Sequence, residues 1–279
     1  METKPDYLND IKEGERFGFG KNWSEFLDSV GEKQIGSAKN SFLEVWPYDN
    51  LSGKTFLDIG SGSGLSSLIA RGLGAKKIFS FDYDQDSVST SKKIKNKYDS
   101  SNQDWHIEQG SVLDEEYMKS LGKFDVVYSW GVLHHTGQMW KALEHAQVPV
   151  ADNGYLFIAI YNDQGTKSKV WHFIKKTYCS GRIGRLLMKI LCIPYFIIGG
   201  LALDIVRLDN PIKRYTEYSK KRGMSVYHDW IDWIGGLPFE VATPKVIEDF
   251  YSKYGLTLVA SNLTDKLGCN EFVFKKSNS

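Results

Sequence analysis

The chain has 279 residues, of which 42% are hydrophobic, 25% charged and 14% aromatic, and its formal net charge is +1. This composition excludes a disordered segment, a collagen-like fibre and a disulfide-rich scaffold, and it leaves ample apolar material for a sizeable core. A net charge so close to zero gives by itself no reason to expect a nucleic acid or an anionic membrane as a partner.

The three cysteines, Cys179, Cys192 and Cys269, show neither metal-ligand nor redox spacing, which indicates buried thiols in a reducing compartment. The polar N-terminus lacks the apolar segment of a signal peptide. The longest uncharged apolar run, 190–203, contains Pro194 and is shorter than the roughly 18 residues expected of a membrane-spanning helix. We therefore expect a buried or interfacial pair of helices there, in a soluble, cytoplasmic protein without a metal site.

Residues 1–50 are rich in aromatic side chains at helix-like spacing and are expected to form an N-terminal helical arm. Short β-rich runs then alternate with helix-like patterns. Strands are predicted at 55–59, 77–82, 105–109, 124–129 and 155–161, and helices at 65–73, 86–98, 115–121 and 138–148. This alternation is typical of a doubly wound α/β fold with a parallel sheet and right-handed crossovers.

The alternation stops after residue 161 and resumes at Thr243, an expected N-cap that is followed by Pro244 at the first helical position. A helix is predicted from there to a stop at Gly255. Two final strands are predicted at 256–261 and 271–275. We therefore expect a core made of 51–163 and 241–279, into which a mostly helical cap is inserted at 164–240.

The strongest motif follows the first predicted strand. Asp58 lies near the end of that strand, a helix begins at Leu65, and the glycines between them are Gly60, Gly62 and Gly64. Glycines permit a tight turn and a close approach of the backbone to a ligand, and a helix N-terminus offers free N–H groups. The dinucleotide pattern G-x-G-x-x-G would need glycine in place of Leu65, so the spacing differs from that of a dinucleotide site.

A second motif lies at the tip of the second predicted strand. Asp82 stands where an acidic side chain can accept hydrogen bonds from both hydroxyls of a ribose. The structural alternative for an acidic residue here is an N-cap, a role that we expect Asp84 to fill for the following helix. Because Asp82 lies on the strand itself, we interpret it as a ribose ligand.

Taken together, residues 58–64, 81–82, 110–112 and 128–135 resemble the successive motifs of class I S-adenosylmethionine (SAM) methyltransferases. The resemblance is closest to small-molecule members such as the ubiquinone-pathway O-methyltransferases. It implies a Rossmann-like sheet of seven strands in the order 3-2-1-4-5-7-6, with the last strand antiparallel. It also implies that SAM is the cofactor and methyl donor.

The resemblance further implies the residues that hold SAM. Those expected around the methionine and ribose portion are Asp58, Gly60, Ser61, Gly62, Gly64 and Trp130. Those expected around the ribose hydroxyls and the adenine are Asp82, Tyr83, Ser111 and Val112. The aromatic arm resembles the lid that closes over SAM in related enzymes, and its expected contacts are Phe19, Gly20 and Trp23. The alternative for this arm is an aromatic patch that docks the N-terminal helix on the sheet.

Methyl transfer is an in-line displacement at the sulfonium methyl, so the protein mainly positions the nucleophile and excludes water. His134 and His135 follow the fourth strand, where the acceptor would meet SAM, and either could serve as a base or as a structural residue. Tyr161 ends the fifth strand on the same side. In the cap, His228 and Asp229 lie in a segment dense in aromatic and acidic residues, which supplies either a base or a docking surface.

The cap carries most of the positive charge. Residues 164–223 contain 13 Lys or Arg and 3 Asp or Glu, whereas the rest of the chain contains 22 and 31. This patch predicts a solvated helical face, a subsite for an anionic acceptor or membrane surface, or contact with RNA, but not with DNA. We expect a SAM-dependent methyltransferase that acts on a small or medium-sized acceptor at oxygen. The alternatives are S- or N-methylation, tRNA methylation through the cap, and a non-catalytic SAM-binding regulatory protein.

Overall fold

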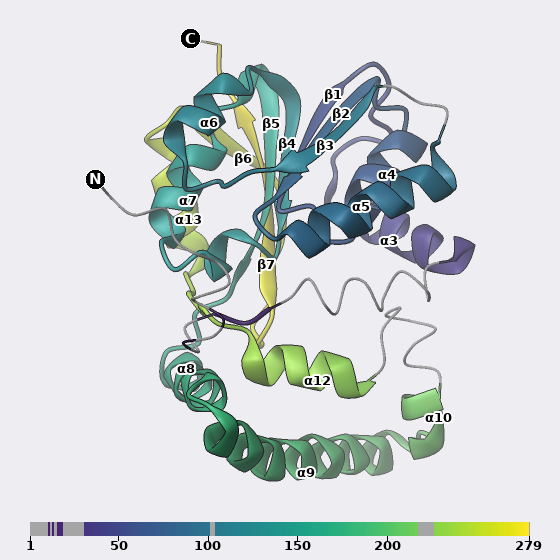
Figure 1. Ribbon diagram of the computed structural model, residues 1–279, viewed down its shortest axis with the longest axis vertical. Coiled ribbons are helices and arrows are strands. Elements are labelled where there is room, and N and C mark those ends of the chain that lie inside the picture. The colour runs from purple at the N-terminus through teal and green to yellow at the C-terminus, as the bar shows by residue number, and fades with distance from the viewer. Residues whose placement is uncertain are drawn as a thin grey trace.

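A seven-stranded sheet lies at the centre of the computed structural model, which describes residues 11, 13, 16–18, 31–100, 104–216 and 226–278 (Figure 1). For residues 216, 228 and 232 the structure describes the backbone and not the side chain. The strands are β1 Thr55–Ile59, β2 Lys77–Asp82, β3 Trp105–Gln109, β4 Phe124–Trp130, β5 Val150–Tyr161, β6 Leu256–Asn262 and β7 Cys269–Lys276. Their order is β3-β2-β1-β4-β5-β7-β6, and β7 runs antiparallel to both neighbours, so the predicted fold is confirmed.

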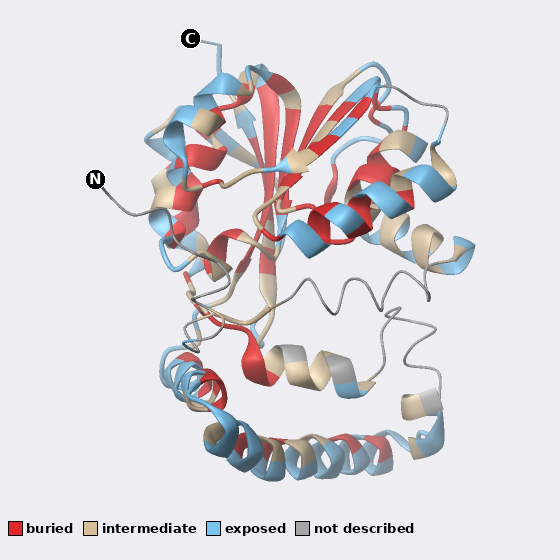
Figure 2. Cartoon of the chain, viewed as in Figure 1, coloured by how far each residue is buried: buried red, intermediate tan, exposed pale blue. Residues whose placement is uncertain are grey.

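Helices cover both faces of the sheet. On one face lie α3 Glu32–Val45, α4 Leu65–Gly72 and α5 Gln85–Tyr98. On the other lie α6 Glu115–Ser120, α7 Met139–Ala146 and α13 Pro244–Ser252. The short 3-10 helix η1 Leu133–His135 follows β4. The central strands are buried on both sides, as expected of a parallel sheet between two helical layers (Figure 2).

Local capping explains where several helices begin. Asp84 is the N-cap of α5, and its side chain accepts a hydrogen bond from the backbone N–H of Asp86 at 3.0 Å, which confirms the predicted cap. Helix α7 has no such residue of its own, and the carboxylate of Glu240, far along the chain, accepts from the N–H of Met139 at 3.0 Å. This contact joins the end of the cap to the core.

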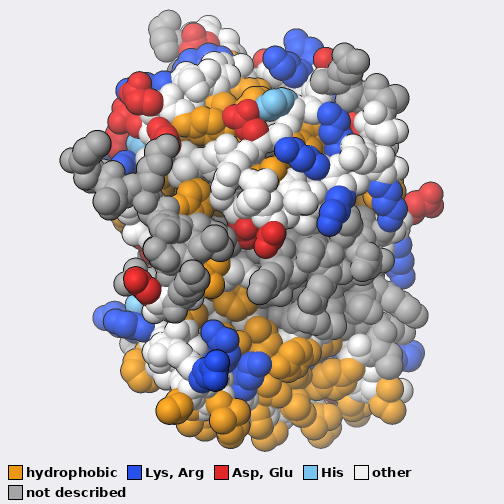
Figure 3. Space-filling model, viewed as in Figure 1, with side chains coloured by type: hydrophobic (Ala, Val, Ile, Leu, Met, Phe, Trp, Pro, Cys, Tyr) orange, Lys and Arg blue, Asp and Glu red, His pale blue; other side chains and the backbone are white. Residues whose placement is uncertain are grey.

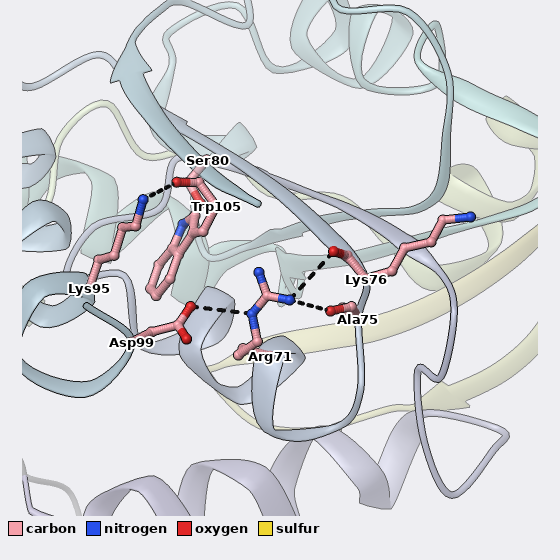
Figure 4. Close-up of polar contacts among 7 residues, drawn as sticks. All are labelled: Arg71, Ala75, Lys76, Ser80, Lys95, Asp99 and Trp105. Atoms are coloured by element: carbon pink, nitrogen blue, oxygen red, sulfur yellow. Dashed lines mark hydrogen bonds and ion pairs between the residues drawn. The ribbon is translucent and has the colours of Figure 1, made fainter. Parts of the chain in front are cut away.

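Two basic side chains tie the helices of one face to the sheet (Figure 4). Arg71, near the end of α4, donates to the carbonyl of Ala75 at 2.7 Å and to the carboxylate of Asp99 beyond α5 at 3.3 Å. Lys95 of α5 donates to the carbonyl of Trp105 at 2.5 Å. These hydrogen bonds go to carbonyls at the start of β2 and β3, and they thereby help to fix the position of α4 and α5 on the sheet.

The inserted helices form a separate layer below the carboxyl ends of the parallel strands (Figure 1). They are α8 Thr166–Cys179, α9 Arg182–Arg207, α10 Pro211–Thr216 and α12 Val226–Gly235. They share a small hydrophobic core of their own, whose buried members are Trp171, Tyr178, Cys179, Met188, Cys192, Ile234, Leu237 and Phe239. The chain enters and leaves this layer at one place, where Asn162 forms a parallel bridge with Ala242.

The expected helix pair at 190–203 is wrong, because α9 is one continuous helix of 26 residues with Pro194 inside it. The glycines do not break it. A Cβ on Gly200 would lie 3.3 Å from Cδ of Arg214, so this glycine allows α10 to pack closely. One turn further on, buried Asp204 accepts from Arg214 at 2.7 Å and 2.5 Å.

Of the two expected positions of this segment, buried or interfacial, burial is wrong, since most side chains of α9 are exposed, and the interfacial position stays a prediction. Among the described residues α9 is the one helix that is long and apolar enough to cross a membrane, judged by length and composition. A window of 18 residues within it has a mean hydropathy of 2.1, and only 17% of that window is buried. Its outer surface is therefore a large apolar area without a protein neighbour among the described residues.

Candidate cofactor and acceptor site

The glycine loop is held between the ends of two strands. The N–H groups of Gly60 and Ser61 both donate to the carbonyl of Phe81, at 2.9 Å and 3.0 Å. Gly60 has φ of +73°, and a Cβ there would lie 2.4 Å from Cγ1 of Val132, which follows β4. Glycine is therefore required here both for the backbone conformation and for the close packing of Val132.

Asp82 fastens this loop to the start of α5. Its Oδ2 accepts from the N–H of Gly62 at 2.8 Å, and its Oδ1 accepts from the N–H of Asp84 at 2.9 Å. Burial raises the pKa of Asp82 to about 6, and these backbone donors act in the opposite direction. Each carboxylate oxygen can accept more than one hydrogen bond, so Asp82 retains acceptor capacity for ribose hydroxyls.

Asp58 ends a buried chain of hydrogen bonds that begins at Trp105. The indole N–H of Trp105 donates to Ser80 Oγ at 2.9 Å, and the Oγ atoms of Ser80 and Ser67 lie 2.6 Å apart. Ser67 donates to Asp58 Oδ2 at 2.6 Å, so its single proton is used and Ser80 must donate to it. The sequence prediction missed Ser67 and Ser80, because their role depends on α4 packing against β2.

Burial raises the pKa of Asp58 to about 7, and the neighbouring charge of Asp82 adds to the effect of burial. Both carboxyls are thus partly protonated in the unliganded protein just below neutral pH. The ammonium group and ribose hydroxyls of the cofactor are donors, and they are bound best by ionised carboxylates. The predicted contacts therefore imply that cofactor binding favours proton release from both residues.

We expect binding of S-adenosylhomocysteine (SAH) to strengthen as the pH rises through about 6 to 7, because both folded-state pKa values are raised. Below those values Kd should increase by up to about tenfold per pH unit for each group that must ionise. Calorimetry across this range measures the slope and the released protons. In Asp58→Asn the part of the slope near pH 7 should disappear, and a Kd that does not change with pH would contradict the assignment.

The other predicted cofactor residues have varied surroundings. Tyr83 is half-buried, and its ring faces Arg16, whose Cζ lies 5.9 Å from the ring centre. Ser111 Oγ accepts from the N–H of Leu113 at 3.2 Å and so shapes the turn after β3. The side chain of Val112 is buried in the core, which leaves backbone groups for any adenine contact.

Trp130 ends β4 and is about half exposed, and its indole N–H donates to Glu271 Oε1 of β7 at 2.6 Å. Its ring therefore extends across β5 at the carboxyl edge of the sheet. The predicted lid residues Phe19, Gly20 and Trp23 lie outside the described part of the chain. The cofactor roles of these four residues stay predictions, as do those of the other predicted cofactor residues.

Three of the predicted catalytic side chains lie together. The ring of Tyr161 lies 4.1 Å from that of His134 and 5.4 Å from that of His135, measured between ring centres. The histidines follow Val132, which packs on Gly60, so this ring cluster lies next to the glycine loop. An acceptor bound against these rings would therefore lie close to the predicted cofactor.

Both histidines are held in the neutral state. Burial lowers the pKa of His135 to about 3, and the positive charge of Lys175 acts in the same direction. Burial also lowers the pKa of His134 well below its usual value. His135 Nδ1 lies 2.5 Å from the carbonyl of Pro238, so Nδ1 carries the proton and Nε2 is the acceptor nitrogen. Neither histidine is a strong base near neutral pH.

The cap adds aromatic rings and a cation to this cluster. Tyr161 also contacts Trp233 of α12 and Phe239, with ring centres 5.6 Å and 5.2 Å apart. Lys175 of α8 is fully buried, with its Nζ 4.7 Å from the ring centre of Trp233 and 4.9 Å from that of Phe239. It also donates to the backbone carbonyl of Trp233. The sequence prediction missed Lys175, because its spacing alone does not distinguish it from the exposed lysines of the cap.

The two other predicted catalytic residues lie on α12. Asp229 is half-buried and precedes Trp233 by about one turn, and it is Trp233 that makes the contact between α12 and Tyr161. The side chain of His228 lies outside the described part of the structure. An apolar groove of about 420 Å³ lies elsewhere in the cap, between α9, α10 and α12. It is lined by Ile197, Leu201, Tyr215, Val226, Tyr227 and Trp230.

The described part of the N-terminal arm crosses this site. Arg16 donates to the carbonyls of His135 and Thr136 at 3.0 Å and 3.3 Å, and its guanidinium also faces the ring of Tyr83. The N–H of Phe17 donates to the carbonyl of Leu237 in the cap at 3.0 Å. The arm thus joins the predicted adenine side, the ring cluster and the cap. Phe17 is the first residue of the arm that resembles a lid, whereas Arg16 was not predicted to contribute to the site.

The donor set of the site is made of carboxylates, backbone N–H groups and aromatic rings, which fits an adenosine cofactor rather than a metal ion. Among the described residues no group of three or more His, Cys, Asp or Glu is placed to hold a metal. The carboxylates of Asp58 and Asp82 lie along one edge of the sheet, whereas the N–H groups of Gly60 and Ser61 already donate to the carbonyl of Phe81. The two carboxylates are suited to bind the amino-acid and ribose portions of SAM.

Known proteins share this organisation. A family model described as "Methyltransferase domain" matches residues 31–186. Ribosomal protein L11 methyltransferase from Streptococcus thermophilus is 24% identical over 170 residues, which cover 56% of this chain and 49% of that protein. The chain thus matches about half the length of this curated relative.

Two solved structures show the same fold. Magnesium protoporphyrin IX methyltransferase from Synechocystis PCC 6803 with bound SAH has a TM-score of 0.52 at 13% identity, covering 99% of this chain and 90% of that one. PKMT2 from Rickettsia typhi has a TM-score of 0.55 at 15% identity, covering 90% and 53%. The family match covers more than half of this chain. The chain therefore belongs to the methyltransferase domain family, and its seven-stranded sheet has the strand order expected of class I SAM-dependent methyltransferases.

Proposed function

We propose that this chain is a SAM-dependent methyltransferase that transfers the methyl group to an oxygen of a small or medium-sized anionic acceptor, which binds beside the ring cluster on the side that faces the cap. The observation that carries this proposal is the buried cation Lys175 beside two neutral histidines and Tyr161. A buried ammonium group attracts an anionic partner strongly, because water screens the interaction little. A carboxylate or an acidic phenol fits this surrounding.

The low pKa of His135 supports an acceptor that arrives already ionised. A neutral alcohol would need a base to remove its proton during transfer, and a base with so low a pKa is weak. An ionised oxygen instead attacks the methyl carbon directly, the carbon–sulfur bond breaks, and its electron pair goes to sulfur. The products are the O-methylated acceptor and neutral SAH. His135 Nε2 and Tyr161 would then orient the acceptor rather than accept its proton.

The acceptor class can be tested with methyl-labelled SAM and a small-molecule extract separated by anion exchange. We expect label in an anionic fraction, in a product that hydrolyses as a methyl ester or survives as a methyl ether. Label in a ribonuclease-sensitive product would favour the tRNA alternative, and label in protein would favour a macromolecular acceptor. Binding of SAM without transfer to any fraction would favour a regulatory role.

We expect Lys175→Met to raise KM for the labelled anionic acceptor at least about tenfold, because an ion pair to a buried charge is worth more than about 1.4 kcal/mol. Lys176→Met removes the same charge from the neighbouring, exposed position and should leave KM unchanged. The affinity for SAH, measured by calorimetry, should be similar in both variants. Equal KM values for the two variants would contradict the proposed anionic subsite.

Two further expectations stay predictions. The kinship with the ubiquinone-pathway O-methyltransferases and the cytoplasmic location are supported by sequence patterns alone. One relative is named as a methyltransferase of a ribosomal protein and another as a methyltransferase of a magnesium porphyrin. Proteins with this fold therefore act on acceptors of very different size. The acceptor of this chain must therefore be identified from its own products.

A further inference from the structure

The outer face of α9 is apolar over its whole length. Here the outer face means Ile183, Leu187, Ile190, Leu191, Ile198 and Ile205, which are all exposed. Counted from Ile183, the others lie 4, 7, 8, 15 and 22 residues further along, and these intervals bring a side chain back to the same side of a helix. A helix of 26 residues is about 39 Å long, so this is a long aliphatic strip at the base of the molecule (Figure 3).

The opposite side of α9 is attached to the protein. Its buried residues Met188, Cys192, Gly200 and Asp204 recur at intervals of four or eight, and α8, α12 and α10 pack against the helix. Asp204 is paired with Arg214 of α10. Because this side is attached to the other cap helices, α9 could cross a bilayer only by leaving them and exposing their shared core.

The charges of α9 that reach solvent are all basic. They are Arg182, Arg185 and Lys189 near its start and Arg207 at its end, and their positions place them on the side of the helix away from the outer face. Exposed Lys213 on α10 and Lys169 and Lys176 on α8 add to this positive charge. Figure 3 shows Lys and Arg side chains next to the hydrophobic surface at the base of the molecule. A helix with one apolar side and basic residues on the other is complementary to a bilayer surface that carries anionic headgroups.

We propose that the outer face of α9 binds in the plane of an anionic lipid bilayer, with its aliphatic side chains inserted among the lipids and its basic side chains at the headgroups. The cap lies on the carboxyl side of the sheet, so this orientation turns the cofactor and acceptor side toward the membrane. The docking proposal does not depend on the proposed function, since it concerns a surface separate from the glycine loop and the ring cluster.

The test is flotation of the full chain, saturated with SAH, with lipid vesicles. We expect the protein to float with phosphatidylcholine–phosphatidylglycerol vesicles at least about tenfold more than with phosphatidylcholine vesicles, and less in high salt. Ile190→Ser combined with Ile198→Ser should reduce binding at least about tenfold, because these side chains, 59% and 65% exposed, would enter the lipid.

A control variant removes two other exposed aliphatic side chains that lie outside the cap. Val246 on α13 and Val259 on β6 are 47% and 45% exposed, and their double replacement by serine should leave flotation unchanged. SAH affinity should be the same in both double variants, which shows that both are folded and separates this result from any test of methyl transfer. An equal loss in the two variants would contradict the role of α9.

Other occupants of the face give different results. Binding that resists extraction with alkaline carbonate would mean that α9 crosses the bilayer, and it would overturn the in-plane proposal. A dimer in lipid-free solution that the α9 variant dissociates, together with an absence of flotation, would assign the face to a second copy of the chain. Absence of flotation with anionic vesicles would overturn the proposal in any case.

Discussion

Asp82→Ala is expected to weaken SAH binding at least about 100-fold. The carboxylate holds the N–H groups of Gly62 and Asp84 and is also the predicted acceptor for both ribose hydroxyls. Hydrogen bonds to a charged group are each worth about 1.5–3 kcal/mol, so losing two to the ligand corresponds to about 3 kcal/mol or more. At about 1.4 kcal/mol per tenfold change, this is about 100-fold in Kd. Calorimetry with SAH measures it directly.

Asp86→Ala is the matched control for this prediction. Asp86 is exposed in the first turn of α5, so its replacement changes the net charge equally but removes no predicted cofactor contact. Asp82→Asn is expected to bind SAH poorly as well, because an amide has one acceptor atom and cannot receive both backbone N–H groups and the ribose. Thermal unfolding without ligand measures how far the variant is destabilised by losing the hydrogen bonds from Asp82 to the glycine loop. A change in Kd of less than about threefold for Asp82→Ala would show that the ribose lies elsewhere.

Gly60→Ala is expected to lower the free energy of unfolding by about 2–4 kcal/mol and to abolish measurable SAH binding. The new alanine would have to keep a left-handed backbone conformation, which costs roughly 1–2 kcal/mol. Its Cβ would also overlap Cγ1 of Val132, with the two atoms 2.4 Å apart. The overlap must be relieved by moving the loop or the segment after β4, and both border the predicted cofactor site. Denaturant unfolding and SAH calorimetry measure the two effects.

Two variants separate the causes of this effect. Gly53 also has positive φ, +71°, but a Cβ there meets nothing within 4 Å, so Gly53→Ala should show only the conformational cost. Adding Val132→Ala to Gly60→Ala removes the overlapping methyl groups and should recover part of the lost stability and binding. If Gly53→Ala and Gly60→Ala were equally destabilising, the contact with Val132 would have no energetic role.

The sheet was predictable because its signals are local. The predicted strands at 55–59, 77–82 and 105–109 coincide with β1, β2 and β3, since each is a short apolar run between turn residues. The N-cap at Asp84 was predicted for the same reason, because a cap involves residues two or three positions apart. The strand order followed from the resemblance of the motifs and not from the strands themselves.

The course of α9 was not predictable by the same reasoning. Pro194 and the glycines at 199 and 200 are local signals of a break, but the reason for Gly200 is the approach of Arg214 from another helix. Tertiary packing can outweigh such local preferences. Burial, one of the two expected positions of this segment, is wrong because hydrophobicity indicates that a side chain avoids water, and it does not identify what covers that side chain.

The candidate site was predictable where a motif encodes it and not where distant segments meet. His134, His135 and Tyr161 were expected near the acceptor from their places after β4 and β5, and the structure brings their rings together. Lys175 and Arg16 were missed because each acts across more than 50 positions in the chain, on Trp233 and His135 respectively. Their basic side chains look like ordinary surface charges until the cap and the arm are folded onto the core.

The bridge between Asn162 and Ala242 has a consequence for the evolution of this enzyme. The chain leaves the sheet and returns to it at adjacent positions, and the N–H of Ala242 donates to the carbonyl of Tyr161 at 3.0 Å. Because the two ends already touch, the length of the segment between them affects the entropy of closing the loop only weakly, by about 0.6 kcal/mol for each doubling. Insertions, deletions or wholesale replacement of this segment can therefore accumulate without altering the strands, so a lineage can exchange its cap while it inherits the sheet intact.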